Sequence, residues 1–321
     1  SVLYPRLDQR LKEVFVKLIG KALGFDPVGD ATSAEHFGYN GVRVIDHFFS
    51  GIPPERPAAV PHAFVTLASV AAITKKVTLT QTVMAATMRH PFELAQGVSC
   101  LDRISNGRAE LGLGAGWLVA EHKMNGLALG SPGERVSRLV EVASICRQLF
   151  VDSGCIEFLG KFFKVYSDAP WPSTPHVPEI MVGAHGLRLI EKVSPYVDRI
   201  DLLESMIDGR PCFVGDHSND IKNLRNKIEV HYSRAERKTK VSATINLKVI
   251  EDNKSLEIAQ AELASAANCN VSDIKRDHLR IIENETKVFE KLEALAGIGI
   301  DRLHIRPNDE YTKEWLNESV L

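Results

Sequence analysis

Several polar or glycine-rich segments that could carry chemistry follow directly after runs typical of β-strands. Asp46-His47 comes after the apolar run Val42–Ile45, and Thr82-Val83 ends a β-branched run that begins at Val77. An imidazole near its ordinary pKa suits proton transfer at neutral pH. In parallel α/β folds the loops after the strands are where ligands bind, so we expect these side chains to face a ligand. The alternative for His47 is a structural histidine bonded to loop backbone.

Two glycine-containing segments are candidates for backbone contact with a ligand. Gly112, Gly114 and Gly116 end a strand-like run, and glycine lets the backbone approach a flat ring closely. The segment Gly183-Ala184-His185-Gly186 ends another strand and opens a helix, where free backbone N–H groups bind phosphate well. Arg188 would add positive charge there. The alternative for this segment is a tight turn that needs glycine for steric reasons alone.

Arg89-His90 precedes a helix expected to begin at Pro91. These two residues either contact a cofactor or cap the helix and order the loop before it. Asp102, Ser105 and Arg108 lie at a helix end and a strand start, which is the face of an α/β barrel away from its catalytic mouth. We therefore expect them to support the fold, not the chemistry.

The elements that position these residues alternate between strands and helices. The expected strands are Val14–Leu23, Val42–Ile45, Val77–Val83, Arg108–Leu113, Glu179–Val182, Val197–Leu203, Val241–Ile250 and Ile300–Ile305. Eight strands alternating with helices predict a (β/α)8 barrel, here a single domain over residues 1–321. An open doubly wound sheet is the alternative, but the GxGxG segment does not follow the first strand, where a dinucleotide fingerprint belongs.

Two additions to this barrel are expected. The segment Ile156–Tyr166, split by Gly160-Lys161, has the pattern of an inserted β-hairpin. The segment Phe48–Pro61 contains four prolines, Pro53, Pro54, Pro57 and Pro61, and is too long for a simple connection. We expect it to act as a lid or a substrate loop.

Composition argues for an ordinary globular protein. Charged residues make up 25% of the chain and the formal net charge is -2, which gives no reason to expect nucleic acid or a membrane surface as a partner. The 5 cysteines are scattered without a CxxC pair, so we expect them to be reduced and no metal to be bound. Early charges such as Arg6 and Asp8 argue against a signal peptide, and we expect a cytoplasmic protein.

An ordered set of motifs resembles the bacterial luciferase-like family of flavin-type oxidoreductases. The run Leu101-Asp102-x-x-Ser105-x-Gly107-Arg108 followed by Leu113-Gly114-Ala115-Gly116-Trp117 is the most specific part. The other matching pieces are Ala34-Glu35-x-x-Gly38, Asp46-His47, Arg89-His90-Pro91, Glu121 with Gly126, Glu134-Arg135 and Val182-Gly183-x-x-Gly186. The resemblance covers roughly residues 26 to 203 and weakens beyond them.

The resemblance implies a (β/α)8 barrel, usually homodimeric, that binds reduced FMN or the deazaflavin coenzyme F-420 at its mouth. It implies His47 as general acid or base, Asp46 as its support or a contact to coenzyme hydroxyls, and Trp117 in the substrate pocket. Thr82-Val83 matches a position where several members carry a non-prolyl cis peptide near the flavin ring. The family places the cofactor phosphate at Gly183–Gly186.

Three functional hypotheses remain at this point. The chain length, Asp46-His47 and the Gly-Ala-Gly-Trp segment favour hydride transfer with the deazaflavin coenzyme to or from a small organic substrate. The alternatives are a two-component FMN monooxygenase served by a partner reductase, and a relative that binds cofactor without turnover. Trp117 and Ala120 replace residues of the sugar-phosphate dehydrogenase branch, and Ile282–Thr286 replaces the usual Gly-x-Pro-Glu helix start. These departures argue against that branch and weaken the resemblance near the C-terminus.

Overall fold

The computed structural model describes residues 20–22, 26–50, 58–152, 154–172, 174–184, 186–204, 206–207, 210–211, 220–234 and 239–319. Half of the expected lid, residues 51–57, and His185 of the expected phosphate segment lie outside these ranges. At the two ends of the lid segment, β3 (Phe49–Ser50) and β4 (Ala58–Ala59) pair antiparallel.

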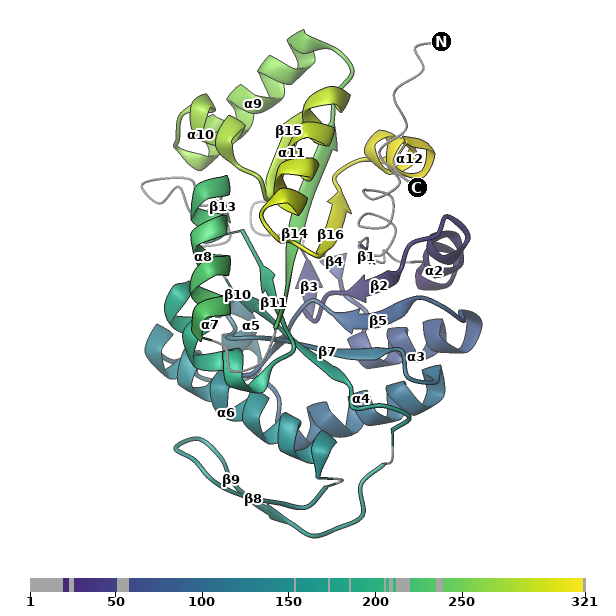
Figure 1. Ribbon diagram of the computed structural model, residues 1–321, viewed down its shortest axis with the longest axis vertical. Helices are drawn as coiled ribbons and strands as arrows, with labels where there is room; N and C mark the ends of the chain where they lie inside the picture. The colour runs from purple at the N-terminus through teal and green to yellow at the C-terminus, as the bar shows by residue number, and fades with distance from the viewer. Residues whose placement is uncertain are drawn as a thin grey trace.

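The centre of the molecule is a curled parallel sheet that makes a (β/α)8 barrel (Figure 1). Its strands, in chain order, are β1 (Gly20–Ala22), β2 (Gly41–Val44), β5 (Thr78–Gln81), β7 (Ala109–Gly114), β10 (Glu179–Ala184), β11 (Arg199–Leu202), β14 (Lys240–Val249) and β16 (Arg302–Pro307). Each strand pairs in parallel with the next, and β16 lies against β1. The predicted barrel is confirmed, and β1 lies within the first predicted strand, of which residues 14–19 and 23 lie outside the described residues.

Helices cover the outside of the sheet, as Figure 1 shows. They are α2 (Pro27–His36), α3 (Ala63–Ile73), α4 (Pro91–Ser105), α6 (Pro132–Val151), α7 (Leu187–Val193), α8 (Ile221–Arg234), α11 (Glu285–Gly297) and α12 (Glu310–Ser319). Their starts follow from local sequence. Asp26 caps α2 with Pro27 at its first position, and Ser131 with Glu134 forms a capping box on α6. The apolar faces of α3, α4 and α6 bury residues such as Leu67, Leu94 and Leu139 completely.

The residues expected to support the barrel's lower face do so. Arg108 donates hydrogen bonds to the backbone carbonyls of Ala71, Thr74 and Val77 at 2.7–3.0 Å, which ties β7 to the end of α3. The carboxylate of Asp102 accepts from the N–H of Ala109 at 3.2 Å. These contacts hold a helix end and two strand starts together, away from the mouth.

The predicted hairpin forms as β8 (Ile156–Leu159) and β9 (Lys164–Ser167), which project outward beyond α6 (Figure 1). Two expectations from the residue pattern were wrong. Residues 117–130 were predicted to be a loop but contain helix α5 (Val119–Met124). Residues 272–282 were predicted to be a helix, whereas Arg280–Glu283 forms strand β15. β15 pairs with the far half of β14, after α9 (Asn253–Ala267) and the short α10 (Val271–Arg276). The two errors have different causes: α5 is a short helix that buries only Glu121 and His122, whereas β15 is buried through its pairing with β14, which the local pattern does not reveal.

Charged groups fill part of the barrel interior. Arg302 on β16 donates two hydrogen bonds to Glu110 on β7, at 2.7 and 2.8 Å. Asp201 on β11 accepts from Ser242 and from His304 at 2.6 and 2.7 Å. The Arg302–Glu110 bonds join the second half of the barrel to the first, and the Asp201 bonds tie strands within the second half. Both sets pair charges in an interior where a buried unpaired charge would be costly.

Among the described residues, no helix is both long enough and apolar enough to cross a membrane. The described cysteines Cys100, Cys146, Cys155 and Cys269 are free, and Cys212 lies outside the described residues.

Candidate functional site

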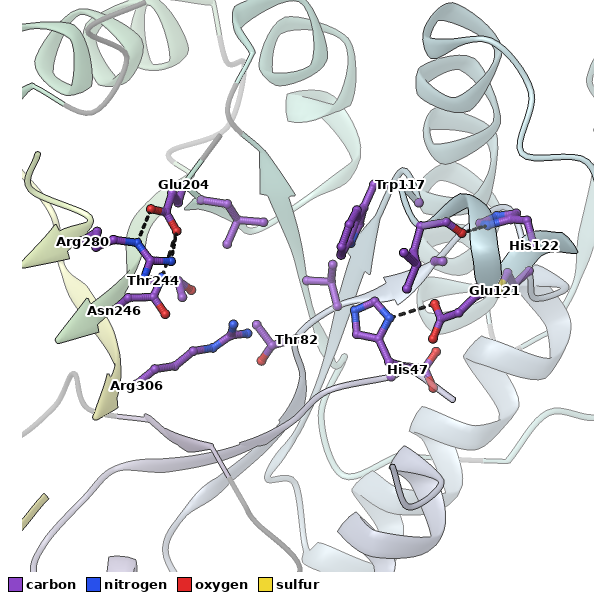
Figure 2. A pocket seen from close by; sticks show the side chains of 17 residues that line it. His47, Thr82, Trp117, Glu121, His122, Glu204, Thr244, Asn246, Arg280 and Arg306 are labelled. Carbon is purple, nitrogen blue, oxygen red and sulfur yellow. Dashed lines mark hydrogen bonds and ion pairs between the residues drawn. The ribbon is translucent and has the colours of Figure 1, made fainter. Parts of the chain in front are cut away.

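A cavity of about 240 Å³ opens at the carboxyl ends of the barrel strands (Figure 2). Side chains from both halves of the barrel line it. They are Asp46, His47, Thr82, Val83, Ala85, Met88, Gly116, Trp117, Leu118, Glu121, His122, Leu203, Glu204, Thr244, Asn246, Arg280 and Arg306. The predicted residues Asp46, His47, Thr82, Val83, Gly116 and Trp117 are therefore brought together.

His47 is held in a fixed orientation at one side of the cavity. Its Nδ1 lies 2.8 Å from a carboxylate oxygen of Glu121, whose other oxygen accepts from the N–H of Phe48 at 2.7 Å. Because a carboxylate can only accept, Nδ1 carries the proton and Nε2 is left to exchange one with a ligand. Trp117 packs edge-on against the imidazole with ring centroids 5.9 Å apart, so the histidine is fixed by both a hydrogen bond and a ring contact.

Asp46 has its own partner. Arg89 donates two hydrogen bonds to its carboxylate, at 2.9 and 2.6 Å, and a third to Glu93 at 3.2 Å. Arg89 does not line the cavity, and its bidentate contact orders the loop behind Asp46. His90 is the N-cap of α4 and accepts from the N–H of Phe92 at 3.3 Å. For Arg89 and His90 the structure thus provides the loop-ordering and capping roles, and cofactor contact stays a prediction.

The peptide bond between Thr82 and Val83 is cis, as the resemblance suggested. Both residues line the cavity immediately after β5. The Thr82 hydroxyl is buried and has no hydrogen-bond partner among the described residues. This segment therefore presents an unused polar atom next to an apolar side chain at the cavity wall.

Gly112 and Gly114 lie in β7 and Gly116 follows it, and the three glycines differ in their surroundings. A Cβ at Gly112 would lie 1.8 Å from the carbonyl oxygen of Gln81, and one at Gly114 would lie 2.4 Å from the Val83 side chain. Both positions require glycine because neighbouring strand and loop atoms pack against them, and neither lines the cavity. Gly116 does line it and has a φ of +78°, a conformation that favours glycine. Direct cofactor contact at Gly112 and Gly114 stays a prediction.

The Gly183–Gly186 segment lies at the end of β10, beside the cavity but not among its lining residues. Gly183 and Ala184 are buried, and a Cβ at Gly183 would approach the Leu203 side chain to 2.6 Å. Gly186 is exposed and is the N-cap of α7, with Arg188 exposed in the first turn. Open space surrounds Gly186, so a phosphate could approach there, and its binding stays a prediction.

The opposite wall of the cavity comes from the second half of the barrel. Arg280 donates to both oxygens of Glu204, at 2.6 and 2.8 Å, and Asn246 donates to Glu204 at 3.1 Å. Thr244 donates its hydroxyl to Asp201 at 2.6 Å. Arg306 extends from the end of β16 into the cavity, toward Thr82 and His47 (Figure 2).

Sequence reasoning missed most of this second wall, together with His122 and the role of Glu121. Glu204 and Arg306 follow the predicted strands Val197–Leu203 and Ile300–Ile305 directly, so the rule that selected Asp46-His47 would have selected them too. Arg280 was not predicted as a site residue because strand β15, which carries it, was not predicted. Glu121 was noted only as a family match, since its segment was expected to be a loop.

Comparison with known proteins identifies the relatives of this barrel. The family model for luciferase-like monooxygenases matches residues 28–198. The chain belongs to the luciferase-like monooxygenase family. It is 30% identical over 182 residues to an uncharacterised protein of Mycobacterium tuberculosis, covering 51% of this chain and 62% of that protein.

Another relative is an F-420-dependent glucose-6-phosphate dehydrogenase of Amycolatopsis mediterranei, 30% identical over 52% of this chain and 49% of that enzyme. The match thus spans about half to three fifths of the curated relatives. A solved structure of an F-420-dependent secondary alcohol dehydrogenase superposes with a TM-score of 0.76 over 94% of this chain and 97% of that one, at 18% identity. That similarity extends the common fold across both walls of the cavity.

Proposed function

We propose that this protein is an oxidoreductase that binds a flavin-type cofactor at the barrel mouth and transfers a hydride to or from a small organic substrate. The observation that carries the proposal is His47, oriented by Glu121 beside Trp117 at a cavity bordered by Thr82-Val83. Between cofactors we favour the deazaflavin coenzyme F-420, in keeping with the F-420-dependent relatives.

The residues present suit a flat, polar-edged ring. Val83, Ala85 and Leu203 supply apolar surface, and the buried Thr82 hydroxyl, which has no partner in the described part of the chain, would be available to a ring nitrogen or oxygen. When bound, the deazaflavin supplies hydride transfer chemistry. The exposed Gly186 and Arg188 would hold its phosphate at the start of α7.

The role that we assign to His47 is proton transfer at the substrate oxygen. Nε2 takes a proton when a hydroxyl is oxidised to a carbonyl and returns it in the reverse direction. Glu121 keeps Nδ1–H in place and stabilises the imidazolium that forms, because its carboxylate lies 2.8 Å away. Asp46, held by Arg89, would position the loop that carries His47 or accept from a cofactor hydroxyl.

A two-component FMN monooxygenase is the second candidate, favoured by the luciferase-like monooxygenase family to which the chain belongs. In that case a partner reductase would supply reduced FMN, and His47 would still handle a proton. A cofactor-binding relative without turnover is the third candidate. We also propose a homodimer, which light scattering on the purified protein would test.

Fluorescence titration with F-420 and with reduced FMN, the latter without oxygen, tests the proposal. We expect micromolar binding of F-420 and weaker binding of FMN, with no oxygen consumption when reduced F-420 is mixed with a panel of alcohols and carbonyl compounds. Tight binding of FMN alone, with substrate-dependent oxygen uptake, would establish the monooxygenase instead. A folded protein that binds neither cofactor would refute both.

The phosphate position has a matched test. Arg188→Gln should weaken cofactor binding by roughly threefold to tenfold, the effect of one exposed charge near a phosphate. Arg276→Gln removes an equivalent charge from the exposed α10 and should leave the affinity unchanged. Equal affinities in all three proteins would exclude Arg188 as a phosphate contact.

A further inference from the structure

Among the described residues, the charged side chains that line the cavity form pairs, with one exception. Asp46 is bound by Arg89, and Glu121 by His47. Glu204 is bound by Arg280. Arg306 lines the same cavity, and its side chain has no hydrogen bond or ion pair with the described residues.

The acids around Arg306 are already engaged. Asp201 accepts from Ser242 and His304 through one oxygen and from Thr244 through the other, at 2.6–2.7 Å. Arg280 occupies both oxygens of Glu204. Both carboxylates are therefore hydrogen-bonded to other side chains, and neither has a hydrogen bond or ion pair with Arg306 among the described residues.

The position of Arg306 also makes it costly to leave unpaired. Its side chain is half-buried, and burial lowers the pKa of its guanidinium more than Asp201 and Glu204 raise it. A planar guanidinium with several donors in fixed positions is best satisfied by a carboxylate or another oxyanion. Folding alone gives this group no such partner among the described side chains.

Figure 2 shows where the partner would sit. The Arg306 side chain extends from β16 toward Thr82, with His47 beyond it on the opposite wall. A ligand lying in front of Thr82 is therefore approached by His47 from one side and by Arg306 from the other. A reacting carbon beside His47 and an anionic group beside Arg306 can belong to one small molecule.

We propose that Arg306 binds an oxyanion of the substrate, so that the substrate is a small organic carboxylate or similar oxyacid that reacts beside His47. Naming the substrate rests on the proposed function, whereas anion binding by Arg306 does not. The anionic edge of a reduced cofactor ring offers the same chemistry from a second source, and the experiment separates the two.

The probes are sodium acetate and inorganic phosphate, with acetamide as the neutral counterpart of acetate. Isothermal titration at constant ionic strength is run on the protein with and without F-420. We expect acetate to bind and acetamide not to bind. Arg306→Met should weaken acetate binding by about tenfold or more, as expected for a lost charged hydrogen bond. The matched variant Arg276→Met should bind acetate like the wild type.

Thermal unfolding provides a readout that a structural arginine would not give. Because the Arg306 side chain is paired with none of the described residues, Arg306→Met should melt at least as high as the wild type in low-anion buffer. Saturating acetate should raise the melting temperature of the wild type but not of this variant. Arg306→Lys keeps the positive charge but lacks the planar guanidinium, so it should retain part of the acetate affinity. This variant allows the same measurement if Arg306→Met fails to fold.

Unchanged acetate affinity in Arg306→Met would overturn the proposal. So would a variant that binds acetate normally but loses affinity for reduced F-420, because Arg306 would then serve the cofactor. If the wild type binds acetate through Arg306 but binds neither F-420 nor FMN, the anion site stands and the proposed oxidoreductase function fails.

Discussion

The two walls of the cavity differ in origin and in chemistry. The first wall, from β2, β5, β7 and α5, carries His47, Thr82 and Glu121 and lies within the part of the chain that matches the family model. The second wall, from β11, β14, β15 and β16, carries Glu204, Arg280 and Arg306 and lies outside that match. One barrel thus combines a wall that lies within the family match and a wall that lies outside it.

This difference follows from how a (β/α)8 barrel works. Every strand contributes its carboxyl end to the same mouth, so one set of loops can keep a reaction while another adapts to a new substrate. We therefore expect changes in the first wall to reduce turnover and changes in the second wall to reduce substrate affinity.

The largest effect is expected at the first wall. His47→Ala should lower kcat by about a hundredfold to ten-thousandfold, the usual contribution of a general acid or base, while cofactor affinity stays within about twofold. Stopped-flow kinetics on the cofactor-loaded protein would measure it. His36→Ala, at an exposed position on α2, is the control. Unchanged turnover in His47→Ala would show that His47 is not the general acid or base and that the first wall does not supply the proton transfer.

The next largest effect is expected on stability, at the Glu110–Arg302 ion pair that connects the two halves of the barrel. Burial raises the pKa of Glu110, but the positive charges of Arg302, Arg43 and Arg199 lower it by more, and the net shift is downward. The carboxylate is therefore charged inside the barrel. Glu110→Gln would leave Arg302 on β16 without its partner and should reduce the free energy of unfolding by roughly 3–5 kcal/mol. Urea denaturation would measure this loss. Glu290→Gln, from an exposed pair with Lys287, should change it by less than about 1 kcal/mol.

A pH-dependent loss of stability should arise from His304, a buried histidine on β16 that is bonded to Asp201. Burial, with a contribution from Arg43, lowers the pKa of His304 from 6.5 to about 3. Between these values the unfolded chain binds a proton that the folded chain does not, so stability falls as the pH drops below 6.5 and levels off near 3. Melting temperatures between pH 8 and 5 should show this decline, and His304→Asn should flatten it. An equal decline in both proteins would assign it to other groups.

The smallest effect is expected from a polar contact of the second wall. Asn246→Ala removes one of the hydrogen bonds to Glu204 and should raise KM by about fivefold, in line with about 1 kcal/mol for one hydrogen bond. The value of kcat should stay near that of the wild type. A fall in kcat with unchanged KM would show that the second wall also takes part in turnover and would end the division between the walls.

Local sequence determined the barrel and the first wall. Period-two apolar runs, helix caps at Asp26 and Ser131 and glycine positions are local signals, and they predicted the eight barrel strands, the inserted hairpin and the position of Asp46-His47. Parallel strands then bring their carboxyl ends together without further information, which is why the predicted residues around His47 do meet.

Only the tertiary structure decided which charges are paired. Arg280 is separated from Glu204 by a long stretch of chain, and β15, which carries Arg280, is recognisable only through its pairing with β14. Arg89 and Arg306 look alike in the sequence, yet one is bound by Asp46 and the other faces the cavity with no described partner. Ion pairing depends on distances across the barrel, and a sequence pattern does not contain them.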